Sequence, residues 1–271
     1  MKKYMKPILS LLTILTFVTS QAFAQNESPY KTSFKVDAPI IAAGIGLSYY
    51  GLTLMGDKEG MTDAELMALN KNDVNAFDRF SAGYDSESAA NLSDIGFYGS
   101  FGLPVLMLLN DNVGSKAGQV AVLYVETMAV TGALFTMVNG NVERARPITY
   151  SPEADINDKN DGNALNSFYA GHTSATAAAS FFAAKIFHDF NPDSRARPYV
   201  WAAAAALPAT VGYLRLKAGK HFLSDNLLGY GIGAAAGILV PQFHKKSNKR
   251  NFTLIPVSGR NFSGAHLTYT F

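Results

Sequence analysis

Apolar residues recur along the chain in long runs that carry few charges and show no sustained alternation of apolar and polar positions. Runs of this length that are rich in Ala and Leu favour helices, because a half-buried strand would alternate with a period of two. Six segments are therefore predicted to be helices: residues 38–56, 95–110, 117–140, 173–187, 199–214 and 226–243. The pattern predicts an all-α fold arranged as a six-helix bundle.

The polar stretches between these segments carry capping and loop signals. Thr62 and Glu65 fit a capping box, which predicts a short amphipathic helix between the first two segments. Residues 151–163 are acidic, rich in Asn and without apolar periodicity, so we expect a solvated lid. An EF-hand alignment is the alternative, but it places Lys159 at a ligand position and Phe168 where a bidentate Glu is needed.

The first 24 residues have the order of a signal peptide, with three lysines before an apolar run that ends in Ala22-Phe23-Ala24. We expect cleavage after Ala24; an uncleaved membrane anchor is the alternative, although the run is short for a span. The basic run 244–250 resembles a solvated helix end, and residues 251–271 are predicted to form a β-hairpin packed on the helices. The expected organisation is a signal peptide over 1–24, a helical domain over 25–250 and the hairpin extension over 251–271.

Composition excludes several classes of function. The formal net charge is only +2 and charged residues make up 16% of the chain, so a nucleic-acid partner is not expected. The hydrophobic share of 48% excludes global disorder. The sequence has no Cys, so thiol catalysis, thiolate metal sites and disulfides are absent.

Two of the five histidines stand among residues that suit phosphate chemistry. Asp225 follows His221 by four residues, so on a helix it could orient one imidazole nitrogen and leave the other as a nucleophile. His172 follows Gly171 before the fourth segment, where free helix N–H groups attract an anion. Arg146, at the end of the third segment, has a planar guanidinium that could hold phosphate oxygens. Taken singly, these features also suit a surface ion pair, an ordinary helix start and a polar helix end.

In this order and with these spacings, the three features resemble the type 2 phosphatidic acid phosphatase and vanadium haloperoxidase superfamily. Its pattern is a Lys seven residues before Arg-Pro, then Pro-Ser-Gly-His, then Ser-Arg, five residues, His, three residues and Asp. Arg146-Pro147, Gly171-His172 and the run from Arg215 through His221 to Asp225 match this pattern. The resemblance spans roughly residues 137–230, and the six predicted helices extend it over most of the chain.

Three positions depart from the family pattern. Asn139 stands where the family has Lys, Tyr169-Ala170 replaces Pro-Ser, and Leu214 replaces the Ser before Arg. On a continuous helix Asn139 would share a face with Arg146 and donate a neutral hydrogen bond, which is about half as strong as a charged one. We therefore expect a weakened or differently specialised enzyme.

The resemblance implies a metal-independent phosphatase that needs no cofactor and hydrolyses a phosphomonoester or pyrophosphate. In this scheme His221 forms a phosphohistidine, Asp225 orients it, and His172 serves as acid and then as base. The implied phosphate-binding residues are Arg146, Arg215, Gly171 and Asn139. A phosphorylated lipid of the cell envelope and a small phosphomonoester both remain open as substrates, and the sequence does not address the oligomeric state.

Two other functions and the location follow from the same observations. A non-catalytic envelope protein that keeps the scaffold is one alternative; a haloperoxidase is the other, disfavoured by the lost charge at Asn139. Six spans that start outside would bring the motifs into the cytoplasm, and Glu126 interrupts the third segment, so we expect soluble or peripheral helices in the periplasm. An inner-membrane protein with a periplasmic active site is the alternative.

Overall fold

The computed structural model describes residues 28–246, 252–259 and 262–269. The predicted signal peptide and residues 247–250 of the basic run therefore lie outside the described residues. The body of the protein is helical, so the predicted all-α class is confirmed. Its long helices are α2 (Phe34–Gly56), α4 (Glu87–Ser100), α7 (Ala117–Asn141), α9 (Gly171–Phe190), α10 (Arg197–Lys217) and α11 (Leu223–His244).

Short helices fill the connections between the long ones. They are α3 (Asp63–Ala68), α5 (Leu103–Met107), α6 (Asp111–Gly114), α8 (Ile156–Asn160) and four 3₁₀ turns, η1 (Lys71–Asp73), η2 (Arg79–Ser81), η3 (Pro147–Tyr150) and η4 (Gly162–Leu165). The predicted capping box is confirmed at the start of α3, where Glu65 N–H donates to Thr62 Oγ1 over 3.3 Å and Thr62 N–H donates to Glu65 Oε2 over 2.8 Å. The predicted loop at 151–163 contains α8 and the start of η4.

The predicted helix over 95–110 is wrong in both bounds. Helix α4 begins eight residues earlier, because Ser86 caps it by accepting from Ala89 N–H. It ends at Ser100, since the chain turns at Gly102 and restarts as α5 with Pro104 in its first turn. The apolar run over 95–110 marks neither bound, because Ser86 lies before it and Gly102 and Pro104 lie within it.

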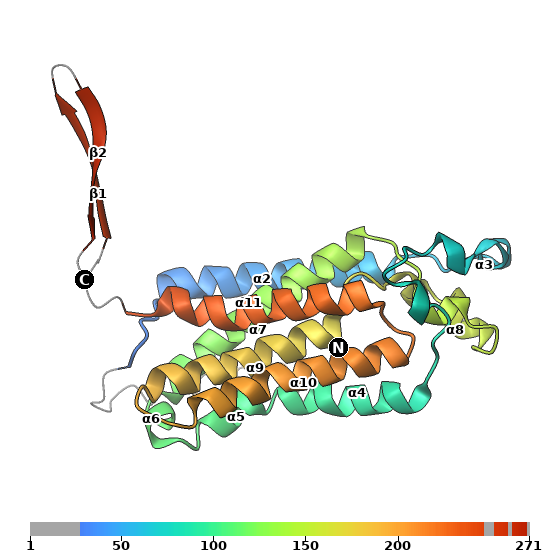
Figure 1. The fold of residues 1–271 in the computed structure, drawn as a ribbon, viewed down its shortest axis with the longest axis horizontal. Helices are drawn as coiled ribbons and strands as arrows, with labels where there is room; N and C mark the ends of the chain where they lie inside the picture. Colours follow the sequence, from blue (N-terminus) through green and yellow to red (C-terminus); the bar gives the residue numbers. More distant parts are fainter. Residues whose placement is uncertain (1–27, 247–251, 260–261, 270–271) are drawn as a thin grey trace, which may run out of the picture.

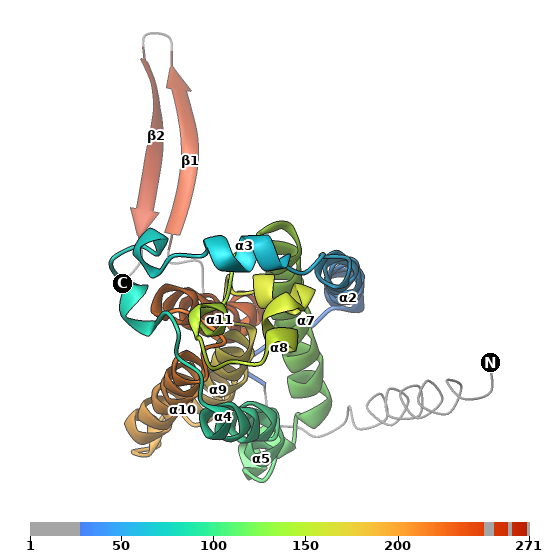
Figure 2. The same ribbon diagram turned by 90° about the vertical axis from the view of Figure 1, so that its right-hand side faces the viewer.

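Helix α9 lies inside the bundle and packs against α7, α10 and α11, and α2 lies along α7 (Figures 1 and 2). Many side chains of α9 are those of Ala, and their small size lets the neighbouring helices approach closely. A Cβ at Gly233 of α11 would come within 2.0 Å of the Ser174 carbonyl oxygen, and one at Gly237 within 2.5 Å of the Ala178 oxygen. Glycines in α11 therefore allow the close approach of α9 and α11.

The two ends of the bundle differ. At one end gather α3, α8, the end of α7 and the start of α11 (Figure 1). At the other end the chain enters and leaves the bundle together, because Tyr30 forms a β-bridge with Lys245. A core cluster that includes Tyr30, Leu123 and Phe182 lies at this second end.

The C-terminal segment forms an antiparallel pair of strands, β1 (Phe252–Gly259) and β2 (Phe262–Tyr269). The hairpin projects away from the helices in both ribbon views (Figures 1 and 2). The predicted packing of this hairpin on the helices is therefore not seen for the described strands.

Among the residues that the structure describes, three helices are long and apolar enough to cross a membrane, namely α2, α7 and α11. Helix α2 also exposes large apolar side chains, among them Ile45 (58% exposed), Tyr49 (71%) and Leu52 (54%). Exposed apolar side chains in such numbers suit contact with lipid. These features support association with a membrane, which agrees with the predicted peripheral helices or with the inner-membrane alternative and disagrees with fully soluble helices.

Candidate active site

The turn between α10 and α11 carries His221 and lies against the segment that follows Arg146. Gly219 adopts a φ of +65°, and a Cβ there would lie 1.9 Å from the Tyr84 carbonyl oxygen. Only glycine fits this position without strain. The Gly219 carbonyl oxygen accepts a 2.9 Å hydrogen bond from Ile148 N–H, which ties the turn to the segment that follows Arg146.

His221 lies in this turn and is buried, with 3% of its surface exposed. Its Nδ1 is 2.7 Å from the Ser167 backbone oxygen. A carbonyl oxygen can only accept, so Nδ1 carries the hydrogen and Nε2 is left with a lone pair. Burial, together with the positive charges of Arg146 and Arg215, holds the pKa of His221 well below 6.5. The imidazole is thus neutral at pH 7 and suited to act as a nucleophile.

Asp225 does not make the contact that the sequence predicts. Helix α11 starts at Leu223, so His221 precedes it and the two side chains do not share a helix face. The Asp225 carboxylate instead accepts from Ser167 Oγ over 2.7 Å and from Phe222 N–H over 2.9 Å, and it pairs with Arg144. Because Ser167 also supplies the carbonyl that receives His221 Nδ1–H, Asp225 acts on His221 through Ser167.

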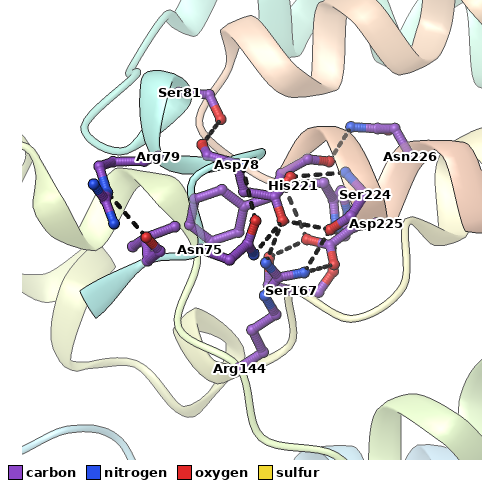
Figure 3. A network of polar contacts seen from close by, with 12 residues as sticks. Asn75, Asp78, Arg79, Ser81, Arg144, Ser167, His221, Ser224, Asp225 and Asn226 are labelled. Carbon is purple, nitrogen blue, oxygen red and sulfur yellow. Dashed lines mark hydrogen bonds and ion pairs between the residues drawn. The ribbon is translucent and has the colours of Figure 1, made fainter. Parts of the chain in front are cut away.

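A network that the sequence reasoning missed surrounds Asp225 (Figure 3). Arg144 lies between two buried carboxylates, pairing with Asp78 over 2.7 Å and with Asp225, and it also donates to Ser224 Oγ over 3.0 Å. Ser224 donates to Asp78 through its backbone N–H (2.9 Å) and its hydroxyl (2.6 Å). Burial raises the pKa of Asp78, but hydrogen bonds from Ser224, Asn75 and Arg144 bring it below the usual value. Asp78 therefore stays ionised and anchors the start of α11.

His172 is the second residue of α9, at the start of the helix as predicted. Its Nε2 lies 3.1 Å from Asp94 Oδ1, and its ring stacks on Phe97 with centroids 4.1 Å apart. Burial and the charge of Arg215 lower the pKa of His172 to about 4, against the opposing effect of Asp94. Asp94 lies on α4 with no motif around it, so the sequence carries no signal for this partner.

Positive charge surrounds the two histidines. Arg215 is 7% exposed and reaches Asp94 Oδ1 at 3.4 Å and Ser93 Oγ at 3.3 Å. Arg146 donates to Asn163 Oδ1 over 2.9 Å, and its Nε is buried without a hydrogen-bond partner among the described residues. Burial and the nearby charge of Arg215 lower the pKa of Arg146 to about 10.

Lys220 is a further cation at this place that sequence reasoning missed. Burial and the charges of Arg146 and Arg215 lower the pKa of Lys220, against the opposing charge of Asp158. Mutual repulsion of this kind is relieved when an anion binds between the groups. The sequence did contain a signal for Lys220: it is a positively charged residue immediately before His221 in the motif.

Asn139 does not face the other site residues. It is fully buried, and its Nδ2 donates over 3.0 Å to the carbonyl oxygen of Tyr169. Helix α7 ends at Asn141, so the helical alignment of Asn139 with Arg146 that the sequence reasoning assumed is wrong. One N–H of the Asn139 amide thus supports the chain just before α9.

Gly171 begins α9, where the sequence places it. A Cβ at this position would lie 2.5 Å from the Phe135 ring, so glycine allows the helix start to approach α7 closely. The N–H groups of this first turn point toward the end of the bundle that holds the histidines, and a helix N-terminus favours an anion.

Comparisons with known proteins agree with the resemblance seen in the sequence. Residues 120–249 match the PAP2 superfamily. A solved structure, described as the first transmembrane PAP2 type phosphatidylglycerolphosphate phosphatase from Bacillus subtilis, aligns with 78% of this chain and 96% of its own chain at 17% identity and a TM-score of 0.44. A search among curated proteins finds no match.

Proposed function

From the premise that residues 120–249 carry a PAP2 superfamily domain, we propose that the protein is a metal-independent phosphatase acting on a phosphorylated lipid. One observation carries the proposal. His221 presents an unprotonated Nε2 beside Arg146 and Arg215, held by the hydrogen bond from its Nδ1 to the Ser167 oxygen. A fixed neutral imidazole among buried cations suits attack on a phosphorus atom that carries negatively charged oxygens.

The first step forms a covalent intermediate. His221 Nε2 attacks phosphorus, the bond from phosphorus to the ester oxygen breaks, and a proton from His172 passes to the departing oxygen. The negative charge of a bound phosphate raises the pKa of His172 from its value in the empty site, which supplies the protonated form. Arg146, Arg215 and Lys220 stabilise the equatorial oxygens.

The second step returns the enzyme to its starting state. His172 takes a proton from water, the water oxygen attacks the phosphohistidine, and the bond between phosphorus and Nε2 breaks to release phosphate. Asp94 holds the His172 ring in place by its 3.1 Å contact. Asp225 and Ser167 keep the His221 ring oriented through both steps.

Lys220 compensates for the missing family lysine in this proposal. Asn139 occupies that position, and its side chain is uncharged, so it brings no positive charge to the phosphate. Its amide donates a hydrogen bond to the Tyr169 carbonyl oxygen. Lys220, which precedes His221 in the sequence, supplies a cation close enough for Arg146 and Arg215 to lower its pKa. The departure at Asn139 is then a relocation of positive charge, which favours an active enzyme over the non-catalytic alternative.

A lipid substrate is favoured by the surface around the helices. Helices α2, α7 and α11 are long and apolar enough to enter a bilayer, and α2 exposes apolar side chains along its length. A site at the end of such a bundle lies at the depth of lipid headgroups when the helices are in the membrane.

The test compares the full chain with His221→Ala and with His188→Gln, whose ring contacts Arg197 and Trp201 outside the site. Phosphate release is measured from phosphatidic acid in mixed micelles and from an aryl phosphate, with and without vanadate. We expect vanadate-sensitive release by the wild type and His188→Gln, its loss in His221→Ala, and an acid-labile phosphoenzyme. Equal release from wild type and His221→Ala would refute the mechanism; no release from either substrate would favour the non-catalytic alternative.

A further inference from the structure

Three ionisable side chains meet near the end of the bundle opposite the active site. They are Asp37 in the first turn of α2, Glu126 in α7 and His244 at the end of α11. Asp37 and Glu126 are each 3% exposed, and 11% of the His244 side chain is exposed. Each of the three membrane-compatible helices contributes one member, so the cluster lies where burial of charge is costly.

The hydrogen bonds fix which atoms face one another. His244 Nδ1 is 2.8 Å from the Val240 carbonyl oxygen, so it carries the hydrogen and Nε2 points inward. Nε2 lies 3.2 Å from Asp37 Oδ1 and 3.5 Å from Glu126 Oε2. The three atoms all lie within 4.8 Å of one another. Ligands at about 2.0–2.1 Å from a tetrahedral zinc ion are roughly 3.3–3.4 Å apart, close to the two measured distances.

Asp37 and His244 are each fixed by a hydrogen bond on their outer side, and their inner atoms face each other and Glu126. Asp37 Oδ2 accepts a 2.7 Å hydrogen bond from Ser33 N–H, which leaves Oδ1 directed at His244. Glu126 Oε2 is buried without a hydrogen-bond partner among the described residues. An outer contact that orients the ligand, with an inner atom directed at the other ligands, is typical of metal sites.

Charge balance also favours a divalent ion. Two buried carboxylates bring two negative charges, and a protonated imidazole would cancel only one of them. A divalent ion bound to a neutral imidazole would cancel both, which removes the penalty of a net charge in an apolar region.

We propose that Asp37, Glu126 and His244 bind one divalent transition-metal ion, with zinc as the best fit, and a water as fourth ligand. One imidazole nitrogen with two carboxylate oxygens suits zinc, whereas calcium and magnesium prefer oxygen ligands alone. The ion would cross-link the start of α2 to α7 and to the end of α11. Its role is structural, because the phosphate chemistry lies at the other end of the bundle.

The experiment uses the full chain purified in detergent and stripped with a chelator. Zinc is added back, and bound metal and thermal unfolding are measured for the wild type, for Glu126→Gln and His244→Gln, and for the exposed control Asp193→Asn. We expect one zinc per chain and a raised Tm for wild type and control, and loss of both effects in the two site variants. X-ray absorption at the zinc edge of the wild type should show imidazole and oxygen ligands.

Three results would overturn the proposal. They are no zinc bound to the wild type, unchanged zinc binding in Glu126→Gln and His244→Gln, or a zinc spectrum without imidazole. The absorption spectrum needs no variant, so the test stands even where a substitution prevents folding. A wild type that binds no zinc would leave a protonated His244 between two carboxylates as the explanation of the cluster.

Discussion

Arg144 offers the sharpest test of how the active site is held together. Its guanidinium lies between Asp78 and Asp225, whose side chains are both fully buried, while 23% of the Arg144 side chain is exposed. It also lies over the Phe222 ring, 4.5 Å from the centroid. Arg144→Ala would leave two buried carboxylates without their common partner.

The expected cost follows from that geometry. Removing one partner of a buried ion pair costs about 3–5 kcal/mol, because the remaining charge stays buried without compensation. The partial exposure of Arg144 lets water reach the carboxylates, so we expect the lower end, about 3 kcal/mol. For a protein of this size each kcal/mol shifts Tm by about 2–4 °C, which gives a fall of roughly 6–12 °C.

The assay is thermal unfolding of the full chain in detergent, with the exposed Arg195→Ala as matched control. Phosphatase activity is followed in parallel, since the loss of Arg144 frees Asp225 and with it the Ser167 contact to His221. Replacing Asp78 by Asn together with Arg144→Ala should recover part of the lost Tm, because one unpaired charge is then removed. A decrease in Tm of less than 2 °C in Arg144→Ala would refute the stabilising role of this ion-pair network.

Further predictions concern the other parts of the site. Lys220→Met should lower kcat/KM by about tenfold or more, as expected for a lost donor to the transition state, whereas Lys35→Met at the far end should not; equal kinetics would exclude Lys220 as a phosphate ligand. Gly219→Ala should lower Tm and activity together, because its Cβ would clash with the Tyr84 oxygen, while Gly46→Ala, whose Cβ meets nothing within 4 Å, should be neutral in unfolding scans. The His172 pKa of about 4 in the folded protein lies below its value in the unfolded chain, so protons bind preferentially to the unfolded state. The contribution of His172 to the free energy of unfolding is therefore complete above pH 6.5 and is lost as the pH falls toward 4. His172→Gln should flatten this fall in Tm between pH 6.5 and 4, and an unchanged slope would contradict the assignment.

Local patterns were enough to predict the helical class and part of the site. The apolar runs form helices because their length and Ala content disfavour strands. The capping box at Thr62 could be predicted because both of its partners lie within one helical turn. The motif residues His172, Arg146, Arg215 and His221 come together as the resemblance implied.

The errors arise where a contact joins distant parts of the chain. Asp78 and Asp94 lie outside the matched segment, and only the packing of α4 and the preceding turns brings Asp78 to Arg144 and Asp94 to His172. The role of Asp225 was misjudged because a helix was assumed to include His221, while the helix begins at Leu223. Periodicity indicates that a helix exists but fixes its first residue poorly.

The bridge between Tyr30 and Lys245 has a consequence for orientation in a bilayer. It places Tyr30 and Lys245, where the chain enters and leaves the helical body, at one end of the bundle, away from His221. A reporter enzyme fused to the C-terminus would thus reveal the compartment that the active site does not face. A leader that is cleaved with residue 25 outside the cytoplasm would turn the candidate active site toward the cytoplasm. The direction in which α2 enters the bilayer therefore decides which leaflet supplies the substrate.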